Sequence, residues 1–162
     1  MKKTVYLLFA VIVLAFASCD KGDMEIKKLN RGEGIWEITS MRYETYDSLG
    51  QHVVSTNTVS APGELVFFKT ASLDALFDYY LVVANMKDPA TGNISAYPGQ
   101  IYYDGNRVSM EEDSDPYHSF PNELEGVWTI TDDGRKKQEW SSYALGTNGE
   151  LAQKTTIYLE KK

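Results

Sequence analysis

The sequence is poor in the residues that form disulfide frameworks and most catalytic centres. Its 162 residues include one cysteine, Cys19, and two histidines, His52 and His118. A single cysteine forms no intramolecular disulfide, so the folded domain must be held together by its core. The spaced motifs of nucleophilic hydrolases, zinc proteases, phosphate-binding loops and dinucleotide-binding folds are also missing. We therefore expect both histidines to be surface residues, and we expect no enzymatic activity, no cofactor and no metal site.

Positive charge is scarce as well. The chain has 16 lysines and arginines against 23 aspartates and glutamates, a formal net charge of −7, and its basic residues form no cluster. Such a surface repels phosphate backbones, which argues against nucleic acid as a partner. The most acidic run, residues 111–115 (EEDSD), offers oxygen ligands for Ca²⁺ but lacks the glycine and the spaced glutamate of a dedicated calcium loop. We interpret this run as a solvated loop.

Only one stretch of the sequence is almost continuously apolar. Residues 5–16 follow two lysines, and the small residues Ala17 and Ser18 separate this run from Cys19. This order is typical of a signal peptide with a small-residue cleavage site, and the run is too short to span a bilayer comfortably. The stretch resembles a bacterial lipoprotein precursor, which implies a signal peptide over residues 1–18 and a lipid on Cys19 that makes the membrane a partner. The alternative is an ordinary signal peptide followed by a chance cysteine.

Residues 19–31 are polar and charged, and we interpret them as a short tether between the bilayer and a single domain over residues 32–162. Removal of residues 1–18 changes the net charge to about −9, which favours the solubility of an exported domain. Residues 20–23 (DKGD) resemble the surface-export signals of Bacteroidetes lipoproteins, and a plain solvated linker explains them equally well. The expected location is the outer membrane of a bacterial envelope, on either its periplasmic or its outer face.

The rest of the sequence reads as β-strands almost throughout, with no convincing long helix. Its alternation slips between Ile38 and Met41, which predicts a β-bulge. Residues 61–63 (APG) are expected to turn the chain, and longer loops are expected over residues 87–97 and 111–122. Asp-Gly and Asn-Gly pairs suit tight type I′ turns. The expected strands are residues 35–43, 52–59, 64–68, 75–86, 100–103, 107–110, 126–132, 136–143 and 152–160.

Eight or nine strands joined mostly by short reversals predict an all-β antiparallel meander. Closing such a meander into a barrel removes the exposed edges that would otherwise invite aggregation. A two-sheet sandwich is the competing architecture. An eight-stranded barrel has room either for packed side chains or for one small ligand. Inward-facing Phe67, Phe77, Tyr79 and Trp128 would fill much of that space.

A short motif opens the first expected strand. A Gly-x-Trp at the position of Gly34-Ile35-Trp36 is characteristic of the lipocalin (calycin) superfamily, and the chain resembles the lipocalin-like lipoproteins of Bacteroidetes. The resemblance implies a barrel in which Gly34 and Trp36 form a plug at the closed end; the alternative is an ordinary core tryptophan near a strand start. The Thr-Asp-x-x-Tyr motif and the late arginine over the tryptophan, which typical lipocalins carry, were not found. What the resemblance implies is therefore limited to the fold and the plug.

Two functions follow from this reading. The first is a lipid-anchored barrel that binds a small apolar or amphipathic molecule, although the sequence names no ligand-binding residues. The second is a surface accessory module without an internal ligand, which contacts glycans or partner proteins through tyrosines such as Tyr97, Tyr102 and Tyr117. Asp47-Ser48-Leu49 matches the acceptor pattern for O-glycosylation in Bacteroidetes, with Ser48 as the candidate, and a plain turn is the alternative.

Overall fold

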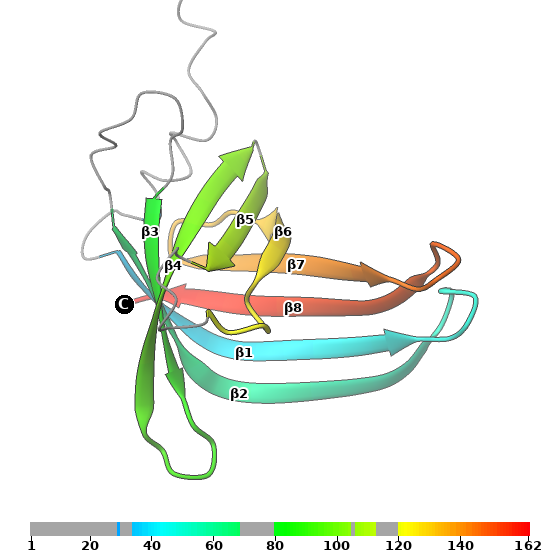
Figure 1. Cartoon of the computed structure of the whole chain (residues 1–162), viewed down its shortest axis with the longest axis horizontal. Helices are drawn as coiled ribbons and strands as arrows, with labels where there is room; N and C mark the ends of the chain where they lie inside the picture. Colours follow the sequence, from blue (N-terminus) through cyan, green and yellow to red (C-terminus); the bar gives the residue numbers. More distant parts are fainter. Residues whose placement is uncertain (1–28, 30–33, 69–79, 105, 113–119) are drawn as a thin grey trace, which may run out of the picture.

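The computed structural model describes residue 29 and residues 34–68, 80–104, 106–112 and 120–162. These residues form eight β-strands; each pairs in antiparallel fashion with the next along the chain, and β8 returns to pair with β1 (Figure 1). The predicted all-β antiparallel meander closed into a barrel is therefore confirmed, with eight strands. They are β1 (Ile35–Tyr46), β2 (Val53–Phe68), β3 (Tyr80–Lys87), β4 (Ile94–Asp104), β5 (Arg107–Glu112), β6 (Gly126–Asp132), β7 (Lys137–Leu145) and β8 (Leu151–Lys161).

A bulge interrupts β1 near its middle. The registers of β1 with β2 and with β8 both shift between Ile38 and Ser40. Thr39 is an extra residue relative to β8, whereas on the β2 side two residues, 61 and 62, lie opposite it. Its hydroxyl donates a hydrogen bond to the carbonyl of Tyr158 on β8 (3.1 Å). The bulge predicted between Ile38 and Met41 is therefore confirmed.

The turn predicted over residues 61–63 is wrong, because β2 runs through it without interruption. Ala61 has a φ of +45°, and Pro62 is buried. The register of β2 with β1 skips both residues, opposite the bulge in β1. The irregular backbone that proline and glycine favour is thus accommodated as a bend within one long strand.

The first expected loop, residues 87–97, is shorter than predicted, and the second begins later in the chain. Strands β3 and β4 both extend into residues 87–97, and only a tight turn joins them. Asp88 closes this turn, because its N–H donates to the carbonyl of Asn93 (2.8 Å). Within the second expected loop, residues 111–122, strand β5 continues to Glu112.

The predicted type I′ turns are also wrong, although the reversals fall where they were expected. Type I′ geometry needs positive φ at both central residues. Within the described part of the chain, Ala61 is the only non-glycine residue with positive φ, so Asp133 and Asn148 do not meet this requirement. Gly149 does, with φ of +84°. Gly105 of the third pair lies outside the described residues.

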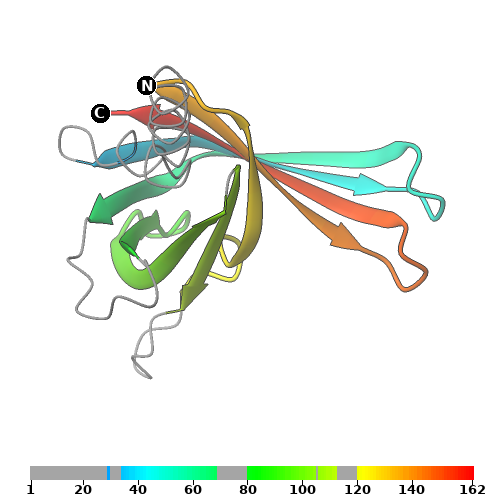
Figure 2. The ribbon, with the colours of Figure 1, turned by 90° about the horizontal axis from the view of Figure 1, so that it is seen from above.

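Beyond the bulge, four strands extend past the barrel as a projection, in the order β2–β1–β8–β7 (Figures 1 and 2). Strand β3 pairs with β2 only over residues 63–68, and the pairing of β6 with β7 ends at Ser141. Among the pairings of the described residues, the two outer strands of the projection therefore have a neighbour on one side only. We call this projection the arm; it consists of residues 40–46, 53–60, 142–145 and 151–156.

Aromatic and aliphatic side chains fill the barrel. Trp36, Trp128 and Trp140 are fully buried, and the ring of Phe67 lies 6.1 Å from that of Trp140. Burial of each such side chain contributes roughly 1.5–3 kcal/mol or more. Every one of the three indole N–H groups is satisfied; the acceptors are the carbonyls of Leu29 and Leu124 and the side-chain oxygen of Gln138, at 3.0, 2.8 and 2.8 Å.

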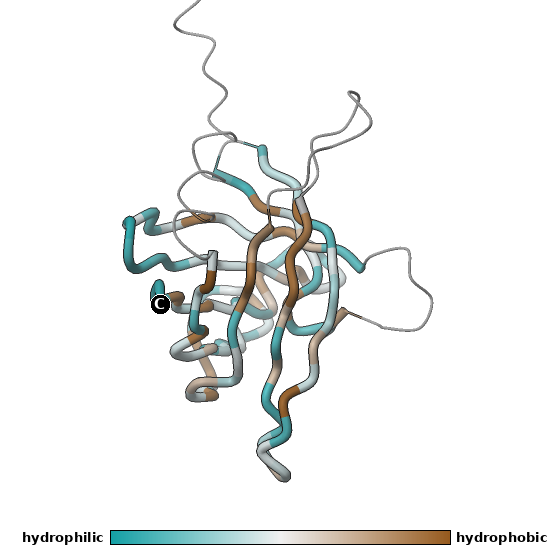
Figure 3. The backbone as a smooth tube through the Cα atoms, turned by 90° about the vertical axis from the view of Figure 1, so that its left-hand side faces the viewer, coloured by the Kyte–Doolittle hydropathy of each residue, from teal (hydrophilic) through white to brown (hydrophobic). Residues whose placement is uncertain are grey.

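The apolar stretches of the chain follow the strands, and hydrophilic residues mark several of the connections between them (Figure 3). The inward positions predicted for Phe67 and Trp128 are confirmed, because both side chains belong to the core. Phe77 and Tyr79 lie outside the described residues. The described barrel is thus a packed core, so a ligand site has to be sought at its ends rather than along its axis.

Candidate functional site

Gly34 and Trp36 lie where β1 enters the barrel. Gly34 has a φ of +68°, which side chains rarely adopt, and its carbonyl accepts a hydrogen bond from the N–H of Phe67 (3.0 Å). Trp36 is buried, and its indole donates to the carbonyl of Leu29. The positive φ of Gly34 therefore directs the start of β1 so that the indole of Trp36 enters the core. The plugging role that the resemblance implies for the pair stays a prediction.

Lys161 covers the ring of Trp36, and the sequence analysis missed it. Its ammonium nitrogen lies 5.5 Å from the ring centroid, within the range of a cation–π contact. The two residues are direct cross-strand partners of β1 and β8. Typical lipocalins carry an arginine over this tryptophan, and looking for arginine alone does not identify Lys161. Pairing the ends of the first and last strands of the expected barrel would have found it.

The packed part of the chain reaches back at least to Leu29. This side chain is 1% exposed and belongs to the core, although the sequence analysis places it in the polar tether. Cys19 and residues 1–18, which carry the signal-peptide and lipidation predictions, lie outside the described residues. In the described part of the chain, no helix has the length and the apolar composition that crossing a membrane requires.

The carboxylate of Glu64 on β2 contacts β3 and Lys162, the residue that follows β8. It accepts hydrogen bonds from Nζ of Lys162 (2.7 Å) and Nδ2 of Asn85 (3.0 Å). The hydrogen bond from Lys162 and, after it, the one from Asn85 lower the pKa of Glu64 below its ordinary value of 4.5. The same contact raises the pKa of Lys162 above its ordinary value of 10.5. This ion pair fastens the end of the chain to β2.

The Glu64 ion pair predicts a defined pH dependence. Because the pKa of Glu64 is lowered by folding, its contribution to stability is present above pH 4.5 and is lost as the pH falls through the folded value. Glu64→Gln should therefore lower the free energy of unfolding by less than about 1 kcal/mol at pH 7, with the difference shrinking below pH 4.5. Urea unfolding at pH 7 and pH 3 measures this. Glu160→Gln, at an exposed ion pair of 3.4 Å, is the control and should show a smaller change.

A cleft of about 780 Å³ opens between the end of the barrel core and the inner face of the arm. Five segments that are distant in the sequence form its walls. They are Met41 and Tyr43 of β1, residues 59–62 of β2, residues 86–89 of β3 and the following turn, Ser95 and Tyr97 of β4, and residues 120–123.

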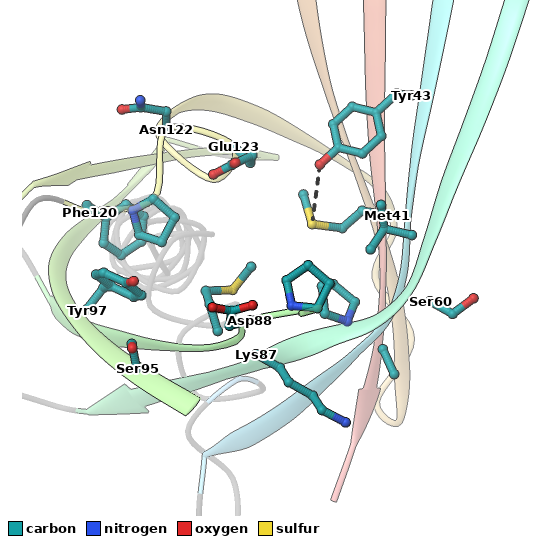
Figure 4. A pocket seen from close by; sticks show the side chains of 16 residues that line it. Met41, Tyr43, Ser60, Lys87, Asp88, Ser95, Tyr97, Phe120, Asn122 and Glu123 are labelled. Atoms are coloured by element: carbon teal, nitrogen blue, oxygen red, sulfur yellow. Dashed lines mark hydrogen bonds between the residues drawn. The ribbon is translucent and has the colours of Figure 1, made fainter. Parts of the chain in front are cut away.

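The walls of the cleft are mainly aromatic and apolar. Figure 4 shows Met41 and Tyr43 on one side and Tyr97 and Phe120 on the other. Phe120 is buried, and its ring packs so closely on Gly99 that a Cβ there would lie 2.6 Å from the ring. Because Gly99 of β4 has no side chain, the ring of Phe120 can pack against the strand and line this wall of the cleft.

Polar groups lie at the rim of the cleft. The hydroxyl of Tyr43 donates to Sδ of Met41 (3.8 Å), and burial, followed by the negative charge of Glu123, raises the pKa of Tyr43 above 10.0. The carboxylate of Asp88 accepts from the backbone, and these hydrogen bonds lower its pKa. Lys87 points away from the cavity (Figure 4). The rim therefore presents a neutral phenol and carboxylates, which favours ligands with hydrogen-bond donors or positive charge.

The other residues singled out in the sequence lie apart from the cleft, except Tyr97, which lines it. Ser48 is exposed in the β1–β2 turn, where the carboxylate of Asp47 accepts from two backbone N–H groups. His52 is exposed beside the same turn. The hydroxyl of Tyr102 donates to the side-chain oxygen of Gln100 (2.6 Å). His118 and Tyr117 lie outside the described residues.

Sequence reasoning missed the cleft because its walls come from five separate segments. The available signal was that Met41 and Tyr43 continue the inward face of β1 beyond the predicted bulge. No family model matches the chain, and comparison with curated proteins found no match. Among the residues that the structure describes, no three His, Cys, Asp or Glu side chains are grouped so that they could hold a metal ion. The barrel and its cleft are therefore the features from which a function can be proposed.

Proposed function

We propose that this chain is a lipid-anchored, non-enzymatic binding protein of the bacterial envelope, related to the lipocalin-like lipoproteins, which holds a small amphipathic molecule at the end of its barrel. The cleft between the core and the arm carries the proposal. Its volume of about 780 Å³ lies within the range typical of small-molecule sites, and its lining combines apolar walls with a few polar groups. The lipid anchor is supported by the order of charged, apolar and small residues before Cys19.

The ligand is expected to sit at the mouth of the barrel rather than along its axis. Three buried indoles occupy the interior, so the apolar part of a ligand can pack only against the cleft walls near Tyr97 and Phe120. Its polar part would face Glu123 and Asp88 at the rim. An anionic head group would be repelled there, whereas a donor group or a cation would be stabilised.

Native mass spectrometry of the full-length protein extracted from its own cells tests this proposal. We expect a bound small molecule on the wild-type protein, and we expect its occupancy to fall at least tenfold in Met86→Trp, which fills the cleft from β3. Val127→Trp is the matched control, because Val127 is exposed on β6 and does not line the cleft. A consistently empty wild-type protein, or equal occupancy in both variants, would contradict the proposal.

A second candidate function is a surface module that contacts glycans or partner proteins without an internal ligand. The packed barrel and the projecting arm favour it, because Tyr143 and Leu145 of the arm and Leu49 in the adjoining β1–β2 turn are exposed. Glycan-array binding of the full-length protein, with no small molecule retained, would support this second function over the first. Silence on the array together with the absence of any co-purifying protein would remove it.

A further inference from the structure

The outer edge of the arm is a long strand with one free side. Residues 53–60 of β2 pair with β1, and the pairing of β2 with β3 begins only at Gly63. Every residue from 53 to 60 is exposed. In the pairings that the structure describes, this segment therefore presents a row of backbone N–H and C=O groups to solvent. We call residues 53–60 the β2 edge.

The central part of the β2 edge, residues 55–60, lacks the features that usually protect a free strand. The sequence of the whole edge, VVSTNTVS, contains no charged residue and no proline, and it is rich in the β-branched valine and threonine. Exposed edges in natural proteins commonly carry lysine, proline or a bulge that blocks further pairing. Here the irregular positions are Ala61 and Pro62 at the inner end and Val54 at the outer end, where the register with β1 shifts, and residues 55–60 between them keep a regular register.

Electrostatics favour this edge as the contact between two copies of the chain. The protein carries a net charge of −7, so two copies repel each other over most of their surfaces. Behind the edge, on β1, the charged neighbours are Arg42 and Glu44, which neutralise each other in a 2.7 Å ion pair. They lie opposite Thr58 and Thr56 of the edge. A second copy can therefore approach along a neutral strip.

We propose that the β2 edge pairs with the β2 edge of a second copy, in antiparallel register centred on Asn57. The pairing is self-complementary, because Thr56 of one copy then lies opposite Thr58 of the other, and Asn57 lies opposite itself on the two-fold axis. Such isologous contacts close into a dimer, and facing threonines are a favourable cross-strand pair. The two arms would join into one continuous sheet of eight strands.

The opposite edge of the arm is a poorer candidate for the contact. On β7 only residues 142–145 extend beyond the pairing with β6. Pairing of that short edge with β2 of another copy would be heterologous and would build open chains instead of a closed dimer. In the proposed dimer, the partner's Ser55 lies opposite Val59, which lines the cleft, so each copy would border the cleft of the other.

Disulfide trapping in the full-length protein tests the register. Opposing Cα atoms in an antiparallel pair are about 4.5–5.5 Å apart, which suits a disulfide bond. In Asn57→Cys, we expect most of the protein in envelope fractions to run as a reducible dimer of twice the mass. Gln153→Cys, an exposed position on the inner strand β8 of the arm, is the matched control and should remain monomeric.

A second variant tests the contact without a cysteine. Sedimentation of the full-length protein in detergent micelles should show a dimer, and Thr58→Lys should weaken its association at least tenfold because it places a charge on each copy in the neutral strip. Gln153→Lys, at an exposed position on β8 that is separated from the edge by β1, should sediment like the wild type. A monomeric wild type, equal trapping at residues 57 and 153, or trapping of Asn57→Cys to a different protein would overturn the proposal. None of these readouts depends on the cleft being occupied.

Discussion

Replacement of Trp36 by alanine is expected to lower the free energy of unfolding by about 3–5 kcal/mol, the range for truncating a buried tryptophan. The side chain is fully buried at the start of β1, donates a hydrogen bond to the carbonyl of Leu29, and lies under Lys161. Removal of the side chain leaves a cavity in the core. It also takes away the indole donor of the Leu29 carbonyl and the ring that Lys161 contacts. Urea unfolding followed by circular dichroism of the purified protein measures the change.

Two further variants separate the contributions at Trp36. Trp36→Phe keeps most of the apolar volume and loses the indole N–H, so it should cost about 1–3 kcal/mol through the unpaired Leu29 carbonyl. Lys161→Met removes only the cation over the ring and should cost at most about 1 kcal/mol. An exposed substitution, Val54→Ala, should change stability by no more than about 0.5 kcal/mol. A loss below 1 kcal/mol for Trp36→Ala would show that this tryptophan does not seal the barrel.

Replacement of Cys19 by alanine is expected to abolish lipidation and, with it, attachment to the outer membrane. A lipid anchor binds through its buried methylene groups, at about 0.8 kcal/mol each, and nothing replaces them once the thiol is gone. The variant should accumulate as an unprocessed precursor that incorporates no labelled fatty acid. Membrane fractionation, metabolic labelling and the apparent mass on a gel measure these three effects.

The control for this experiment is Ser55→Ala, an exposed change in the folded domain that leaves the leader intact. It should be processed, labelled and fractionated like the wild type. Treatment of the wild-type cells with globomycin, which blocks lipoprotein processing, should reproduce the precursor of the Cys19 variant. Unchanged processing and membrane attachment in Cys19→Ala would exclude the lipoprotein assignment, while the barrel and its cleft would be unaffected.

The architecture could be predicted from the sequence because strand patterns are local. Alternation of apolar and polar residues identified most strands, and the slip after Ile38 located the bulge. The errors occurred where partners from elsewhere in the chain override local preference. Residues 61–63 look like a turn, yet pairing with β1 on both sides keeps them in one strand. Residues 87–97 look like a loop, yet the side chain of Asp88 closes a tight hairpin there.

The cleft could not be predicted in the same way, because no single segment contains it. Tyr97 was noted as a residue for contact with glycans, and it proves to line the cleft, but Phe120 and Glu123 carry no local signal of that role. Their position depends on where residues 120–123 lie relative to strands that are distant in the sequence. Lys161 shows the same limitation, since its contact with Trp36 follows from closure of the barrel and not from a motif.

The extra residue in β1 also decides which chemistry the cleft contains. In a regular strand, side chains one position apart point to opposite faces. Ile38 faces the barrel from an even-numbered position, whereas Met41 and Tyr43 face the cleft from odd-numbered positions. The extra residue, Thr39, causes this switch of faces. In a regular strand, Arg42 and Glu44 would face the cleft in place of Met41 and Tyr43. The wall of the cleft would then carry a guanidinium and a carboxylate instead of a thioether and a phenol.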